Sequence, residues 1–404
     1  MIRLLVPLSP TTGHPLQIES EHALTDGVER WPVVAGIPYL RTGRENLRRE
    51  ALAALDHGAP DLALALLLAD QDPFAPVPPP SITELLHLIA EVNAGRCGLR
   101  QAMERLHFGP VADYFAVRTS TPTFLSGLGL LSQCGGGRPV VEVACGIGQL
   151  LREPCRRGAA VAGIDLVFSK LWLARMFVVP DAQLICGNAC GPLAQPTTAV
   201  TVLCHDAFYF FADKVAAATA LMRLAGAGGR VLVGHAHNAY WSHGVAGNLL
   251  TPQGYAELFR GSATFDDAAF ATAHLTGTPA VADHPAAFEA VEAVSLAWVQ
   301  QAEIFPGRPD AFAAPTEGTP LVLNPLLEVV DGKLTPRWPS PRFAAEYRTA
   351  DYLIGEPPPP DAVLDDAEHF VGSYSPETAE WLENRAETVR LARKRVLLPM
   401  EDAV

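Results

Sequence analysis

Short apolar runs alternate with helical spacings through the middle of the chain, between residues 138 and 238. Short apolar runs bounded by turn residues are typical of buried strands. Strands that alternate with helices predict βαβ units, and therefore an α/β fold with a doubly wound sheet and helices on both faces. The segments that hold the predicted strands are 138–143, 159–164, 182–189, 199–211 and 223–238.

The N-terminal residues 1–43 follow another pattern, in which short alternating apolar runs lie between turn residues. Asp26-Gly27, Trp31-Pro32 and Gly36-Ile37-Pro38 predict turns between short strands. Residues 44–110 then show helical spacing, interrupted by a proline-rich linker at 73–80. Ser81 is a good cap for a helix that ends at Gly95.

Beyond residue 240 the pattern predicts a mixture of helical and strand segments. Thr251-Pro252 begins a helix, residues 321–339 form a hairpin about Asp331-Gly332, and Ser375-Pro376 begins the last helix. The chain thus divides into four predicted parts. They are a β-rich ribbon (1–43), a helical linker region (44–110), a ligand-binding core (111–240), and a lid with a C-terminal extension that completes the sheet (241–404).

Composition and charge narrow the class of protein. The 404 residues are 49% hydrophobic, yet no apolar run approaches the roughly 20 residues of a membrane helix. A net charge of −14 disfavours nucleic acid as a partner. The N-terminus lacks the pattern of a signal peptide, and the seven cysteines form no framework, so we expect a protein of the reducing cytoplasm.

The candidate chemistry begins at a glycine turn. The predicted strand 139–143 leads into Ala144-Cys145-Gly146-Ile147-Gly148, and a helix follows. Glycines let a ligand approach the backbone, and the helix amides point at it. The next strand ends in Asp165, seventeen residues after Gly148, where an acid is placed to accept hydrogen bonds from a ribose. Leu151 replaces the third glycine of a dinucleotide fingerprint, and Glu142 favours a cationic ligand over a pyrophosphate.

These segments resemble, in order, the motifs of the class I S-adenosylmethionine-dependent methyltransferases. VEVACGIG resembles the first motif, with Ala144 in place of its first glycine, and GIDLVFSK resembles the second. The resemblance implies a Rossmann-like methyltransferase sheet, S-adenosylmethionine as cofactor and S-adenosylhomocysteine as product. The cofactor-binding residues that it implies are Glu142, Ala144, Cys145, Gly146, Gly148, Asp165, Leu166, Asn188, Ala189 and His205, with Tyr114 and Arg118 closing over the cofactor from the preceding helices.

Residues 1–43 resemble the Trm112-like zinc-ribbon domain, which supports methyltransferases. The resemblance rests on the aromatic-proline step at Trp31-Pro32 and on Gly36-Ile37-Pro38. Val6-Pro7-Leu8-Ser9 stands where that family often has Cys-Pro-x-Cys, so the thiolates of a zinc site are missing. We therefore expect a metal-free ribbon held by packing.

Histidines follow the fourth and fifth predicted strands, whose carboxyl ends border the ligand in open parallel sheets. They are His205, beside Asp206, and His235 with His237. Histidine suits proton removal near neutral pH, so His205, His235, His237 and the nearby Tyr209 are the candidate catalytic residues, with His205 or His237 as general base. A structural role, hydrogen-bonded in its loop, is the alternative for each.

The same residues have the donor types of a metal site. His235 and His237, with His205 and Asp206, could ligate a transition metal. Strand alternation places His235 and His237 on one face, which serves packing or substrate contact equally well. The sequence alone therefore favours no metal.

Three functions remain open from the sequence. The first is a methyltransferase of a small organic molecule in biosynthesis, acting on oxygen or nitrogen. The second is a methyltransferase of a protein or carrier-bound substrate that docks on the ribbon, and the third is a non-catalytic scaffold. The oligomeric state is open as well, a homodimer included.

Overall fold

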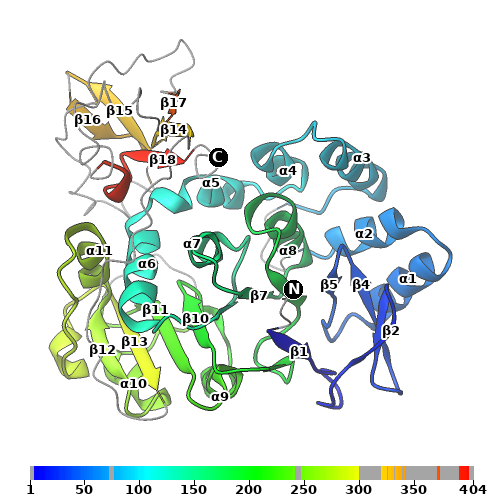
Figure 1. Cartoon of the computed structure of the whole chain (residues 1–404), viewed down its shortest axis with the longest axis horizontal. Coiled ribbons are helices and arrows are strands. Elements are labelled where there is room, and N and C mark those ends of the chain that lie inside the picture. Colours follow the sequence, from blue (N-terminus) through cyan, green and yellow to red (C-terminus); the bar gives the residue numbers. More distant parts are fainter. Residues whose placement is uncertain are drawn as a thin grey trace.

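The structure is a computed structural model, shown whole in Figure 1, that describes most of the chain. The described residues are 4–71, 77–241, 247–299, 320–324, 326–331, 333–338, 341, 371–373 and 391–399. Residues 73–76 of the linker at 73–80 fall outside them, as do the proline-rich stretch at 356–360 and the predicted start of the last helix at Ser375. Residues 391–393 are helical.

A seven-stranded sheet forms the centre of the molecule (Figure 1). Its order is β12-β13-β11-β10-β6-β7-β8, with β13 antiparallel to both its neighbours and the other pairs parallel. The predicted α/β fold is confirmed. The strands are β6 (Val140–Val143), β7 (Val161–Asp165), β8 (Gln183–Cys186), β10 (Thr201–His205), β11 (Arg230–His237), β12 (Ala263–Asp266) and β13 (Ala293–Val299).

Helices cover both faces of the sheet because successive strand residues point to opposite sides. Leu203 and Leu232 belong to a core shared with Phe124 and Phe270 of the helices α6 and α11. Val202 and Val233 belong to another core, shared with the helices α9 and α10. The helices are α6 (Pro122–Cys134), α7 (Gln149–Arg156), α8 (Phe168–Leu173), α9 (Lys214–Ala225), α10 (Pro252–Leu258) and α11 (Asp267–Thr276).

The N-terminal ribbon is joined directly to the edge of this sheet. Its strands β2 (Gln17–Ser20), β3 (Ala23–Thr25), β4 (Arg30–Val34) and β5 (Ile37–Pro38) form one antiparallel sheet. After β5, Tyr39 bridges to Cys186 of β8, and the Leu40 amide donates to the Cys186 carbonyl at 2.7 Å. The strand β1 (Leu5–Pro7) pairs instead with β9 (Ala194–Pro196).

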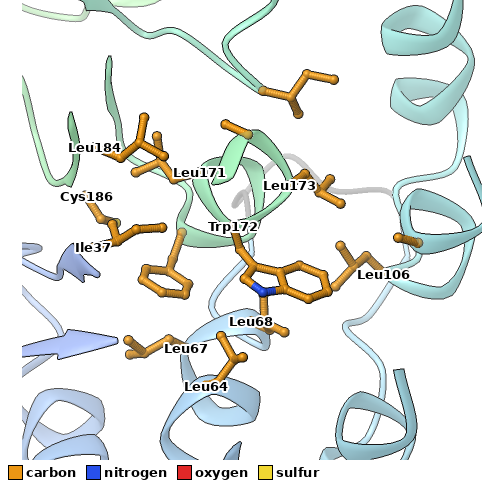
Figure 2. Packing of buried hydrophobic residues seen from close by; sticks show 14 of the residues in the cluster. Ile37, Leu64, Leu67, Leu68, Leu106, Leu171, Trp172, Leu173, Leu184 and Cys186 are labelled. Carbon is orange, nitrogen blue, oxygen red and sulfur yellow. The ribbon is translucent and has the colours of Figure 1, made fainter. Parts of the chain in front are cut away.

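Five helices lead from the ribbon to the sheet. They are α1 (Glu45–Asp56), α2 (Pro60–Leu68), α3 (Ile82–Asn93), α4 (Leu99–Arg105) and α5 (Pro110–Val117). The predicted cap is confirmed, since Ser81 and Glu84 form a reciprocal capping box. In Figure 2 the indole of Trp172 on α8 points between Leu68 and Leu106, which ties these helices to the sheet.

The C-terminal part adds small antiparallel pairings above α6. The strands β14 (Pro320–Leu323), β17 (Val371–Ser373) and β18 (Leu397–Pro399) form one sheet, and β15 (Leu327–Val330) with β16 (Lys333–Pro336) forms the predicted hairpin. Arg395 anchors this part, because its guanidinium donates to the Thr119 carbonyl at 3.0 and 2.8 Å. None of the described helices is long and apolar enough to cross a membrane.

Candidate active site

The glycine turn after β6 requires its glycines. Gly146 and Gly148 have φ angles of +56° and +76°, in the region that glycine adopts without strain. A Cβ on Gly146 would lie 3.0 Å from the ring of Phe115 on α5, and one on Gly148 would lie 2.8 Å from Val179. Ala144 also has a positive φ, +57°, so an alanine carries the conformation that the predicted motif assigns to glycine.

Asp165 ends β7 and ties two turns together. Its Oδ2 accepts a hydrogen bond from the Gly146 amide at 2.8 Å, and its Oδ1 accepts one from the Val167 amide at 2.9 Å. Each carboxylate oxygen has two lone pairs, so each keeps one acceptor position beyond these bonds. The carboxylate is therefore held in place and can still bind hydroxyl groups.

Glu142 lies inside β6, beneath the turn, and is only 3% exposed. Its Oε2 has no hydrogen-bond partner among the described residues. Burial raises the pKa of this carboxyl to about 8, against the opposing effect of Arg118. A buried acid without a cationic partner of its own suits a ligand that brings positive charge.

A second polar cluster lies where β10 and β11 end, and Asp206 is its centre. Asp206 Oδ2 accepts hydrogen bonds from the Tyr114 hydroxyl at 3.0 Å and from Arg118 Nη1 at 2.9 Å. Its Oδ1 accepts one from the Tyr209 hydroxyl at 2.8 Å. Burial by itself would raise the pKa of Asp206, but Arg118 and His235 together bring it below its usual value. Asp206 is thus a fixed anion.

His235 and His237 complete this cluster from the end of β11. Their rings lie 4.8 Å apart, and the His237 ring lies 4.7 Å from that of Tyr209. His235 Nδ1 donates to Asp267 Oδ2 at 2.7 Å. Burial opposes the charged form of His235, but the Asp267 carboxylate outweighs it and raises the histidine pKa to about 9.

Backbone strain marks the same place. Asp206 and His235 have φ angles of +54° and +49°, which are uncommon for residues other than glycine. At His235 the pairing of β11 with β13 shifts register between Val233 and Ala236. Such strain persists only where surrounding contacts enforce it, and it concentrates at functional sites.

His205 lies apart from the cluster, although it precedes Asp206 in the chain. It is 2% exposed, and its Nε2 is 2.6 Å from the Thr123 carbonyl, to which it donates. A Cβ on Gly234 would lie 2.2 Å from His205 Nδ1, so the ring is wedged between α6 and β11. Burial lowers its pKa to about 4. The structure therefore places His205 in a packing position, which disfavours the predicted role as general base or cofactor contact.

A family model described as a methyltransferase domain matches residues 141–233 of the chain. The matched segment runs from β6 into β11 and contains the glycine turn, Asp165 and Asp206. The chain therefore carries a class I S-adenosylmethionine-dependent methyltransferase domain. The enzyme class and the cofactor predicted from the sequence are confirmed for this domain.

Solved structures that resemble the methyltransferase domain are distant. Phosphoethanolamine N-methyltransferase 2 of Haemonchus contortus is 15% identical, with a TM-score of 0.36 over 51% of this chain and 61% of that one. A TehB-like methyltransferase of Corynebacterium glutamicum is 17% identical, with a TM-score of 0.32 over 44% of this chain and 88% of that one. A chain from the Haloferax volcanii complex of the Trm112 activator with a putative methyltransferase is 17% identical. Its TM-score is 0.36 over 48% of this chain and 96% of that one. No curated protein matches the sequence.

The residues of the methyltransferase domain fit S-adenosylmethionine. The ribose hydroxyls and the ammonium group of S-adenosylmethionine are hydrogen-bond donors. The turn region offers acceptors for them in the Asp165 carboxylate, Glu142 Oε2 and Gln149 Oε1. The last two atoms are buried and have no hydrogen-bond partner among the described residues. Gly146 and Gly148 give the turn the positive φ angles that hold these acceptors in place. These residues would hold the cofactor, which supplies a methyl group on a sulfonium centre.

The other predicted residues lie around these two clusters. Cys145 is buried, Leu166 is 38% exposed beside Asp165, and Asn188 is exposed with Ala189 half-buried after β8. Tyr114 on α5 and Arg118 in the following turn contact Asp206, so they connect the helices in front of the glycine turn to the ends of β10 and β11.

Asp267 and Ser295 also belong to the second cluster, although no sequence pattern singles out either of them. Asp267 begins α11, and an aspartate there has the pattern of an ordinary helix start. Ser295 lies on β13, whose antiparallel return to β11 no local motif announces. Only the non-local pairing of the strands brings these side chains to His235.

Proposed function

We propose that the chain methylates an oxygen or nitrogen of a small organic molecule at the carboxyl ends of β10 and β11. The observation that carries this proposal is the second cluster, in which Asp206, His235 and His237 gather beside the glycine turn of a methyltransferase domain. Arg118 links the two places, because it pairs with Asp206 and acts electrostatically on Glu142.

Methyl transfer to oxygen or nitrogen requires an aligned acceptor that has lost its proton. The acceptor's lone pair forms the new bond to carbon, and the sulfur–methyl bond breaks to leave a neutral thioether. His205 already donates to Thr123, and His235 donates its Nδ1 proton to Asp267. We propose that His237, whose ring lies 4.7 Å from that of Tyr209 at the end of β11, is the histidine that meets the acceptor.

We infer a small substrate in preference to a protein that docks on the ribbon. The ribbon is hydrogen-bonded to both β8 and β9, which makes it a structural part of the domain. We propose that residues 1–43 are a built-in Trm112-like ribbon that supports the sheet in this way. All seven cysteines are free, which supports the proposal of a reducing, cytoplasmic environment.

Calorimetric titration with S-adenosylmethionine, followed by a transfer screen with a tritiated methyl group, tests the function. The screen covers phenols, carboxylic acids and amines, with a denatured protein sample as control. We expect saturable cofactor binding that Asp165→Asn abolishes and that the exposed control Asp181→Asn retains. Binding without transfer to any of these acceptors would argue against the proposed substrate class, and unchanged binding by Asp165→Asn would overturn the assigned site.

A further inference from the structure

We propose that Asp206, His235 and His237 bind a divalent transition-metal ion that in turn holds the acceptor oxygen of the substrate. The inference deepens the proposed function and rests on it for the role of the ion. The site itself rests on geometry alone.

The three side chains have the arrangement of a metal site. One ligand atom from each, a carboxylate oxygen and two ring nitrogens, lies within 4.8 Å of the others. An ion about 2.1 Å from each ligand would hold these atoms roughly 3.3 Å apart. The ligand atoms would therefore have to approach one another by at most about 1.5 Å to reach bonding geometry. His235 and His237 are buried, so protein would surround the ion on the side of these two ligands.

The surroundings of His235 are those of a metal ligand. A ligating histidine usually donates its other ring N–H to a carboxylate, which fixes the tautomer and the ring orientation. His235 Nδ1 donates in this way to Asp267 Oδ2, which leaves Nε2 as the ligating atom. Asp267 is itself fixed, because its Oδ1 accepts from the Ser295 hydroxyl at 2.6 Å and from the His235 amide at 3.0 Å. Asp267 and Ser295 thus fix the orientation of the His235 ring.

Asp206 keeps one acceptor position for an ion. Its Oδ2 already accepts from Tyr114 and Arg118, which uses both lone pairs. Its Oδ1 accepts only from Tyr209 among the described residues, so one lone pair remains there. Asp206 would therefore bind the metal through Oδ1 while Arg118 neutralises the other oxygen.

The donor set selects the kind of metal. Two imidazoles and one carboxylate suit iron, zinc, cobalt or manganese, whereas magnesium and calcium prefer sites made of oxygen atoms. Three protein ligands leave coordination positions open. A substrate hydroxyl or carboxylate bound there would come to the ion beside Tyr209. With the ion present, His237 acts on the acceptor through the metal.

The chemistry needs no further reactant. A hydroxyl bound to the ion loses its proton to solvent more readily, because the cation stabilises the oxyanion. The oxyanion then forms the bond to the methyl carbon as the sulfur–carbon bond breaks. The ion is neither oxidised nor reduced. An oxygen acceptor is therefore favoured over an amine.

Metal binding is measured on the full chain without cofactor or substrate. After treatment with a chelator, the protein is titrated with Zn²⁺, Co²⁺ and Mg²⁺, and the visible spectrum of the Co²⁺ form is recorded. We expect one equivalent of Zn²⁺ or Co²⁺ with a spectrum of mixed nitrogen and oxygen ligands, and no competition from Mg²⁺. Absence of stoichiometric binding, or displacement by Mg²⁺, would overturn the proposal.

Variants separate this site from other histidines. His237→Gln should lose the bound equivalent, whereas His87→Gln, at an exposed position of α3, should keep it. Asp267→Asn should weaken metal binding about 10-fold to 100-fold, because it removes the carboxylate that orients the His235 ring. Melting curves show that each variant folds. Equal binding by His237→Gln and His87→Gln would refute the site.

Cofactor binding tests the proposed function separately from the metal site. S-adenosylmethionine binding is titrated on the metal-free protein, where we expect it to persist because Asp165 and Glu142 are not ligands. Metal binding without cofactor binding would contradict the proposed function alone, and the reverse would contradict the metal site alone.

Discussion

Glu142 shows how one buried carboxyl can serve a cationic ligand. It is enclosed by the strands of the sheet, and its pKa is raised to about 8 chiefly by that burial. Near neutral pH the free protein therefore keeps Glu142 mostly protonated. A ligand that brings positive charge favours the ionised form, so binding and deprotonation are coupled.

Replacing Glu142 by glutamine tests this coupling. The pKa lies above its ordinary value of 4.5, so the folded chain retains a proton that the unfolded chain releases. Stability linked to this group is therefore full below pH 4.5 and falls as the pH rises through about 8. We expect Glu142→Gln to melt higher than the parent protein at pH 9 by a wider margin than at pH 5.

The same substitution should weaken the cofactor. Loss of a charge-assisted contact predicts a fall in S-adenosylmethionine affinity of about 10-fold in calorimetry. Glu153→Gln on α7, outside the turn, serves as the control. Parallel melting profiles for both variants would contradict the assigned ionisation of Glu142.

The local signals at residue scale were largely readable from the sequence. The glycine turn could be predicted because the positive φ angles of Gly146 and Gly148 depend on local sequence, and Asp165 follows at the expected spacing. The start of α3 could be predicted from Ser81 and Glu84, which form a capping box. The role of His205 was not readable. Its partner is the Thr123 carbonyl, 82 positions away, and nothing near His205 in the sequence encodes where α6 lies.

The contact between α6 and α11 positions the cluster, since Asp267 begins α11. Gly129 of α6 lies against the backbone of Phe270, where a Cβ would stand 2.2 Å from the carbonyl oxygen. A Cβ on Gly127 of the same helix would lie 3.0 Å from His205 Nε2. Small residues on one face of α6 thus let the two helices meet closely enough for Asp267 to reach His235.

Gly129→Ala should force the two helices apart. The obstacle is backbone and cannot rotate away, so we expect a loss of about 1–3 kcal/mol in unfolding free energy by chemical denaturation. Gly191→Ala is the control, because its Cβ would meet only the Asn188 carbonyl at 3.5 Å. Equal stability of the two variants would show that α11 can shift without cost, and Asp267 would then not be held by this contact.

At the scale of the elements, the order of strands and helices followed from the sequence, but some pairings did not. β1 pairs with β9, about 190 residues later, and an isolated strand carries no signal of so distant a partner. The return of β13 between β11 and β12 is likewise non-local. Local sequence patterns therefore could not predict how the ribbon joins the sheet or which residues form the second cluster.

Across the whole molecule, Gln183 joins the N-terminal ribbon to the sheet. Its side chain accepts from the Leu5 amide at 2.9 Å and donates to the Leu5 carbonyl at 2.7 Å. We expect Gln183→Ala to lose about 1–3 kcal/mol and to speed hydrogen exchange in residues 4–8. Gln195→Ala, exposed on β9, should leave both unchanged. Unaltered exchange in Gln183→Ala would mean that β1 is held by β9 alone.

His274 of α11 couples the stability of the whole molecule to pH, and arginines of the C-terminal part lie close enough to act on it electrostatically. It is 4% exposed, and burial lowers its pKa to about 3, helped by Arg395, Arg393 and Arg157. The folded chain therefore keeps His274 neutral while the unfolded chain takes up a proton below about 6.5. Stability linked to His274 is full above that pH and is lost as the pH falls toward 3.

Denaturant titrations at pH 7 and pH 5 measure this linkage directly. Between these pH values the parent protein should lose about 1–2 kcal/mol through His274 in addition to its other groups. His274→Gln, which cannot take up the proton, should lose less by that amount, whereas exposed His87→Gln should behave as the parent does. The C-terminal part is also held by Arg395, which donates to the Thr119 carbonyl in the turn before α6, so acid should release this part before the sheet unfolds. Identical pH dependence in all three proteins would show that folding does not lower the pKa of His274.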